Sequence, residues 1–256
     1  MPLMKTSNPA LSNKTFQDFA NARYGGALDL SDRMTLGGTV NKTGLLLVLA
    51  AATAAWVWHL FMQSRDMADV APYLMVGVIG GFIVALITTF KRDWAPVTAP
   101  MYALLEGLAL GGISAIFDFR YPGIAIQAVG LTFGTLFALL MVYSTGIIKV
   151  TNKLRIGIIA ATGGIALFYF LEIVLSFFGI RFLAVNSGGP IGIIFSLFVV
   201  AIAALNLVLD FDFVERGVAY GAPRYMEWYS AFGIMVTLVW LYIEILSLLS
   251  KMRSRN

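Results

Sequence analysis

The sequence predicts an all-α integral membrane protein, a bundle of seven transmembrane helices. The first observation is the composition: 59% of the 256 residues are hydrophobic and only 12% are charged, about half the charged share of a soluble domain. The second is the mean hydropathy of +0.83. The third is a series of seven apolar runs of about 20 residues, the length that crosses ~30 Å of hydrocarbon at ~1.5 Å per residue.

The predicted spans follow one another with short connections. Pro72 and Pro100 stand near predicted helix starts, where proline is tolerated, and SGGP at 187–190 forms a loop before the sixth span. Glycines inside the second, third and fifth spans allow close helix approach in lipid, which is a packing interpretation without a functional one. The spans are placed at residues 43–61, 71–90, 95–117, 124–148, 156–178, 191–213 and 228–249.

Two polar segments flank the predicted transmembrane domain of residues 43–250. Residues 1–42 form a polar N-terminal segment, which lacks the short apolar core of a signal peptide and is therefore expected to be retained. Residues 251–256 form a basic tail.

The orientation is predicted from the distribution of lysine and arginine, which favours the cytoplasmic side. If the N-terminus is cytoplasmic, twelve of the 18 basic residues lie on that side and six on the other. This favours a cytoplasmic N-terminus and, with seven spans, an outer C-terminus. The basic tail argues the other way, because a re-entrant seventh run would place the tail in the cytoplasm. The expected location is the bacterial cytoplasmic membrane.

Composition also excludes several kinds of chemistry. The chain has no cysteine and one histidine, so disulfides, thiolate nucleophiles and His-rich zinc sites are excluded. A net charge of +4 is explained by basic residues beside the membrane and gives no sign of nucleic-acid binding. His59 stands at a span end and the only paired aspartates lie on one helix, so intramembrane serine and aspartyl protease sites are not formed. The protein is therefore not expected to be an enzyme or to hold a cofactor.

Acidic residues inside the spans are the candidate functional residues, because a charge in the bilayer is costly and is kept only for a reason. Glu106 is placed near the middle of the third span. Asp210 and Asp212 stand at the cytoplasmic end of the sixth. Glu172 and Glu244 stand in the outer halves of the fifth and seventh. Together they form an acidic ladder of the kind found in cation paths and proton relays.

Each acid also has a simpler explanation. Glu106, if protonated, only hydrogen-bonds a neighbouring helix. For Glu172 and Glu244, solvation at the outer surface is an equally good explanation. Glu215 and Glu227 are expected at the interface, outside any functional path.

Three stretches carry a resemblance to a known family. Glu106-Gly107 followed by Leu110-Gly111 is similar to an EG…LG pattern in that family's third span, and Phe211-Asp212 is similar to the Phe-Asp that ends its sixth span. AFGIMVTLVWLYIEILSLL at 231–249 is similar to its final-helix pattern. In order and spacing the chain resembles the Bax inhibitor (TMBIM-type, YccA-like) membrane proteins, in particular the bacterial branch with a longer N-terminal segment.

The resemblance implies a seven-helix bundle with the last helix central and a pH-sensitive calcium leak. In the better-studied members two aspartates, on the sixth and seventh helices, share a proton and gate the pore. Asp212 matches the first aspartate, whereas the second falls on Thr237, which cannot titrate. The paired-carboxylate gate is therefore broken in this chain, and Glu244, two helical turns further on, is a distant substitute.

Two functions follow from these observations. The first is a cation leak or transporter, with calcium as the permeant ion because hard oxygen ligands suit it. The second is a non-transporting regulator that binds another membrane protein, such as a membrane-bound protease, as YccA-like relatives are thought to do. The acidic ladder favours the first function, and Thr237 favours the second.

Overall fold

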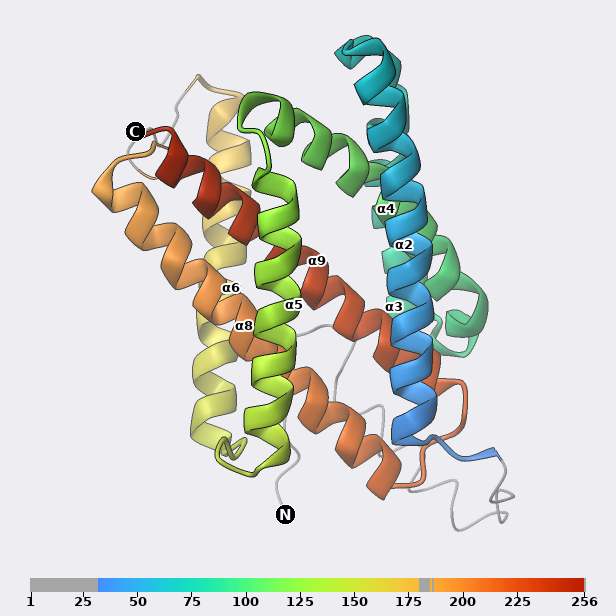
Figure 1. Cartoon of the computed structure of the whole chain (residues 1–256). Coiled ribbons are helices and arrows are strands. Elements are labelled where there is room, and N and C mark those ends of the chain that lie inside the picture. The colour runs from blue at the N-terminus through green and yellow to red at the C-terminus, as the bar shows by residue number, and fades with distance from the viewer. Residues whose placement is uncertain (1–31, 180–184, 186, 256) are drawn as a thin grey trace. The chain divides into compact units, whose positions relative to one another are not determined.

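The computed structural model describes residues 32–179, 185 and 187–255, and these residues form an all-α protein (Figure 1). Seven helices within this part of the chain are long and apolar enough to cross a membrane. The predicted fold class is confirmed. Most of the predicted N-terminal segment, residues 1–31, lies outside the described residues. The helices are α2 (Leu36–Ser64), α3 (Met67–Phe90), α4 (Ala95–Arg120, preceded by the short η2, Arg92–Trp94), α5 (Ile124–Ser144), α6 (Asn152–Ser176), α8 (Pro190–Ala219) and α9 (Met226–Arg253).

Several helices extend beyond the apolar runs that predict them. α2 begins at Leu36 because the Thr35 hydroxyl accepts a hydrogen bond from the amide of Gly38 at 2.9 Å, an N-cap that the apolar pattern does not reveal. α8 continues to Ala219, so the acidic residues of the sixth span lie inside a helix. α9 continues to Arg253, so part of the predicted basic tail is its last turn.

The chain divides into two compact units. Unit 1 comprises residues 1–120 and 210–236, and therefore contains α2, α3, α4, the end of α8 and the start of α9. Unit 2 comprises residues 121–209 and 237–256, and contains α5, α6, the first part of α8 and the last part of α9. The central position of the last helix stays a prediction.

In unit 1, α4 packs closely on α2 and α3 through glycine. A Cβ atom on Gly77 of α3 would lie 2.6 Å from the amide nitrogen of Ala109 in α4, so only glycine fits there. Gly107 of α4 meets the backbone of Ala50 and the hydroxyl of Thr53 in α2 in the same way, and that hydroxyl donates to the Leu104 carbonyl at 3.0 Å. The predicted packing role of these glycines is therefore confirmed for this helix trio.

The start of α2 is tied to the loop between α8 and α9. The amide of Met34 donates to the Ala222 carbonyl at 2.7 Å, and the amide of Arg224 donates to the Asp32 carbonyl at 2.7 Å. Arg33 and Pro223 form an isolated antiparallel bridge between these contacts. Gly221 makes the turn with a φ of 67°, which favours glycine. One end of unit 1 therefore joins segments that are far apart in sequence.

In unit 2, polar contacts link the helices between apolar side chains. The amide of Asn206 in α8 donates to the Thr162 hydroxyl of α6 at 2.8 Å. The guanidinium of Arg253, in the last turn of α9, donates to the Pro122 carbonyl at 2.7 Å and to Gln127 of α5 at 3.0 Å. These contacts fix the end of α9 against the start of α5.

Candidate functional site

Glu106 lies near the middle of α4, at a point where α3 approaches closely. A Cβ atom on Gly81 of α3 would lie 3.0 Å from Glu106 Oε2, so the carboxylate occupies the space that this glycine leaves. Tyr102 stands one turn earlier on α4, and its ring packs edge-on against that of Phe232 in α9, with the two ring centroids 5.0 Å apart. Glu106 is thus half-buried inside the bundle of unit 1, as its position in the sequence predicts.

The two aspartates of α8 lie in different surroundings. Asp210 is only 2% exposed. Asp212 pairs with Arg216 one turn further on, with Oδ2 to Nη2 at 2.5 Å, and Arg216 Nε also donates to the Asp212 carbonyl at 3.2 Å. Sequence reasoning matched Asp212 to the family's first gate aspartate but missed this ion pair, although the i,i+4 spacing of Asp212 and Arg216 was the signal that could have found it.

Glu244 corrects one prediction. Solvation at the outer surface was an equally good explanation for this acid, but it is only 6% exposed. Its carboxylate accepts hydrogen bonds from the Tyr169 hydroxyl of α6 at 2.9 Å and from Trp240 Nε1 on α9 at 3.2 Å. Glu172 is partly buried on α6. Glu244 is therefore an enclosed acid of unit 2 with two hydrogen-bond donors.

Further along α9, Lys251 also turns toward the interior of unit 2. Its ammonium donates to the Ser196 hydroxyl of α8 at 2.8 Å and to the Val185 carbonyl at 2.9 Å. Lys251 was predicted to lie in the basic tail of residues 251–256. The structure instead makes it a helix-to-helix contact, because α9 continues past the apolar run.

Thr237, the position that matches the family's second gate aspartate, is 5% exposed and begins the part of α9 that belongs to unit 2. Asp212 belongs to unit 1. Thr237 is buried, as expected for a side chain that faces the protein interior. Its hydroxyl cannot titrate as the carboxylate of an aspartate would.

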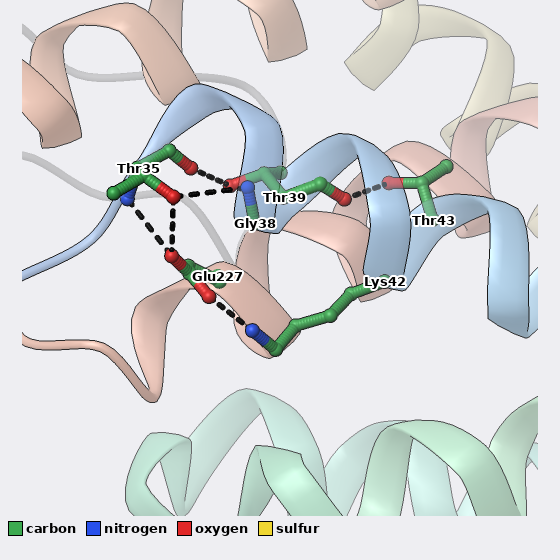
Figure 2. A network of polar contacts seen from close by, with 6 residues as sticks. All are labelled: Thr35, Gly38, Thr39, Lys42, Thr43 and Glu227. Atoms are coloured by element: carbon green, nitrogen blue, oxygen red, sulfur yellow. Dashed lines mark hydrogen bonds and ion pairs between the residues drawn. The ribbon is translucent and has the colours of Figure 1, made fainter.

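Glu227 lies in the first turn of α9, and only 2% of it is exposed. Its position at the membrane interface stays a prediction. Figure 2 shows its carboxylate between the start of α9 and the start of α2: Oε1 accepts from the amide and the hydroxyl of Thr35, both at 2.9 Å, and Oε2 pairs with the Lys42 ammonium. Glu227 therefore joins two helix ends. Sequence reasoning missed it because its partners are 185 to 192 positions away.

The same end of unit 1 gathers aromatic and basic side chains. The Lys42 ammonium lies 5.4 Å from the ring centroid of Trp228, and the Arg92 guanidinium lies 5.9 Å from that of Tyr229. Burial and then the Asp93 carboxylate raise the pKa of Tyr225, while Arg92 lowers it. The Tyr225 hydroxyl therefore keeps its proton at neutral pH and remains a hydrogen-bond donor.

A resident metal site is not formed by the residues that the structure describes. Within them, no group of three or more histidine, cysteine, aspartate or glutamate side chains is close enough to hold a metal ion. Asp212 is held by Arg216, and Glu244 by Tyr169 and Trp240.

Seven long apolar helices with enclosed acidic side chains define an integral, multi-pass membrane protein. The model of the Bax inhibitor 1 like family matches residues 8–254, nearly the whole chain, so the protein belongs to that family. No curated protein and no solved structure matches the chain.

Proposed function

We propose that the protein is a cation leak pathway of the Bax inhibitor type, with calcium as the permeant ion and pH as a modulator. The observation that carries the proposal is the enclosure of carboxyl groups inside apolar helices: Asp210 is 2% and Glu244 is 6% exposed. An acid held within the bilayer costs at least ~2.5 kcal/mol when charged, so such residues commonly mark ion or proton paths. Oxygen ligands suit a hard divalent cation.

The acids have different roles in this proposal. Glu106 and Asp210 offer oxygen ligands inside unit 1. Asp212 acts at the mouth, where the ion pair with Arg216 competes with a cation for its carboxylate. Glu244 offers a further ligand in unit 2. Because Thr237 cannot titrate, pH acts on single carboxyl groups here and not on a proton-sharing pair.

The proposal includes an orientation. The end of unit 1 that carries Lys42, Arg92 and Arg224 faces the cytoplasm, because lysine and arginine favour that side. The N-terminus is then cytoplasmic, and the expected membrane is the bacterial cytoplasmic membrane.

The test is calcium flux into liposomes that contain the purified protein and a trapped calcium dye, across roughly pH 6 to 8, where enclosed carboxyl groups commonly titrate. Asp210→Asn and Glu106→Gln should each lower the flux and flatten its pH dependence. Asp69→Asn is the matched control, because Asp69 is an exposed acid in the first turn of α3. Asp212→Asn should change the pH response without abolishing the flux.

The alternative function is a regulator that binds a membrane protein, such as a membrane-bound protease, without transporting ions. The buried threonine at position 237 favours it, since the titrating partner of the family's gate is missing. Flux no greater than in empty liposomes would refute the leak. Capture of a membrane protease by the wild-type chain, weakened by the same acid-to-amide changes, would then support the regulator.

A further inference from the structure

One pocket of unit 1 remains unused by the proposed leak. It has a volume of about 370 Å³, within the range of small-molecule sites. Its lining residues are Lys42, Pro96, Arg224, Tyr225 and Trp228. They come from the start of α2, the first turn of α4, the loop after α8 and the first turn of α9.

The pocket combines basic and aromatic side chains at a helix end. Trp and Tyr beside Lys and Arg are typical of the level at which a membrane protein meets lipid headgroups. The first turns of α4 and α9 add the partial positive charge of helix N-termini, which favours an anion nearby. The location therefore suits a negatively charged group at the membrane surface.

The charges of the pocket leave one cation available. The Lys42 ammonium is neutralised by Glu227, although it has three N–H donors and can share them. The neighbouring Arg92 and Asp93 side chains carry opposite charges and do not line the pocket. Arg224 is exposed, and among the described residues its guanidinium has no hydrogen-bond or ion-pair partner. The two basic lining residues, Lys42 and Arg224, together with Glu227 therefore sum to one net positive charge.

We propose that this pocket binds a phosphodiester monoanion, the group that an anionic phospholipid presents at the membrane surface. Arg224 donates two N–H groups to the phosphate oxygens, a geometry that a guanidinium provides and an ammonium does not. Lys42 and the Tyr225 hydroxyl are further donors in the lining, and Trp228 packs against the glycerol. One net positive charge matches a phosphodiester better than free phosphate, which carries up to two negative charges near neutral pH.

The test measures binding to the full chain in neutral detergent micelles. Short-chain phosphatidylglycerol, short-chain phosphatidylcholine and inorganic phosphate are titrated separately, at low and at high salt. Wild type should bind phosphatidylglycerol more tightly than phosphatidylcholine, and salt should reduce the difference. Arg224→Gln should weaken phosphatidylglycerol binding about fivefold, the effect of one basic residue at a membrane surface. Arg224→Lys keeps the positive charge but lacks the paired N–H donors of a guanidinium, so it should retain only part of the preference.

Arg65→Gln is the control, because Arg65 is an exposed arginine at the opposite end of α2. Inorganic phosphate could bind more tightly than the lipid and in a way that depends on Arg224. The pocket would then be a phosphate site for a soluble ligand and not for a lipid. Equal binding of the two lipids to wild type would overturn the proposal. So would unchanged binding in Arg224→Gln, or an equal loss in Arg65→Gln. Monodisperse elution of each variant in neutral detergent separates loss of binding from loss of fold.

Discussion

The Glu227 network is the contact whose loss should be most visible in the stability of the protein. Its carboxylate accepts two hydrogen bonds from Thr35 and pairs with Lys42, and only 3% of the Glu227 side chain is exposed, against 16% for Lys42 (Figure 2). In Glu227→Gln, the remaining carbonyl oxygen still accepts from Thr35, but the amide group now faces the Lys42 ammonium. One charge-assisted contact is lost and one cation is left without its partner.

The expected cost follows from the exposures. A hydrogen bond to a charged group contributes about 1.5–3 kcal/mol, and the partial exposure of Lys42 allows water to replace part of it. Glu227→Gln should therefore lower the free energy of unfolding by about 2 kcal/mol. Glu227→Ala also leaves both Thr35 donors without an acceptor, so its cost should reach about 3–5 kcal/mol.

The assay is reversible unfolding in mixed micelles with increasing dodecyl sulfate, followed by circular dichroism. Lys42→Met and the double variant Lys42→Met/Glu227→Gln complete a cycle, in which the coupling between the two residues should be about 1–3 kcal/mol. Asp69→Asn, which removes an exposed carboxylate from α3, serves as the control. A cost below about 0.5 kcal/mol for Glu227→Gln, or additive single changes, would refute the reasoning that this network stabilises unit 1.

Three further predictions follow from the helix contacts. Gly107→Ala should destabilise the protein by about 1–3 kcal/mol, because its methyl group would overlap the α2 backbone. Gly130→Ala is the control and should not destabilise the protein, because no atom lies within 4 Å of its new Cβ. Equal unfolding midpoints for the two variants in the same assay would contradict the packing argument. Glu244→Leu should cost about 1–3 kcal/mol, because it leaves two donors unsatisfied, whereas Glu244→Gln keeps an acceptor and should cost less; the reverse order would count against the hydrogen bonds. Because the native chain has no cysteine, Arg224→Cys and Asp69→Cys can be labelled individually in intact cells with a membrane-impermeant maleimide. Only Asp69→Cys should react, because the proposed orientation places Arg224 on the cytoplasmic side. Labelling of Arg224→Cys alone would show the opposite orientation.

Some contacts of the candidate site could have been predicted from the local sequence, although the lengths of the apolar runs do not indicate them. Asp212 with Arg216, and Trp240 with Glu244, stand at i,i+4 spacing, which places each pair on one helix face. The first contact could have been predicted once α8 was allowed to continue past its apolar run. The second lies within the predicted seventh span of residues 228–249. The N-cap at Thr35 was likewise visible as a threonine just before a helical stretch.

The sequence by itself determined the fold class, the number of spanning helices and the family. These depend on local quantities, since a run of about 20 apolar residues must cross the bilayer as a helix whatever surrounds it. It also showed which acids stand inside the predicted spans, and these are the candidates for the proposed cation path.

Only the tertiary structure decided which acids are enclosed and by what. Glu227 meets Thr35 across 192 positions, and Glu244 meets Tyr169 across 75. The periodicity of one helix does not predict such a pair, because the pairing depends on which helix packs alongside and on how each helix is rotated about its axis. The interfacial pocket is of the same kind: its five lining residues come from four separate segments, and packing alone brings them together.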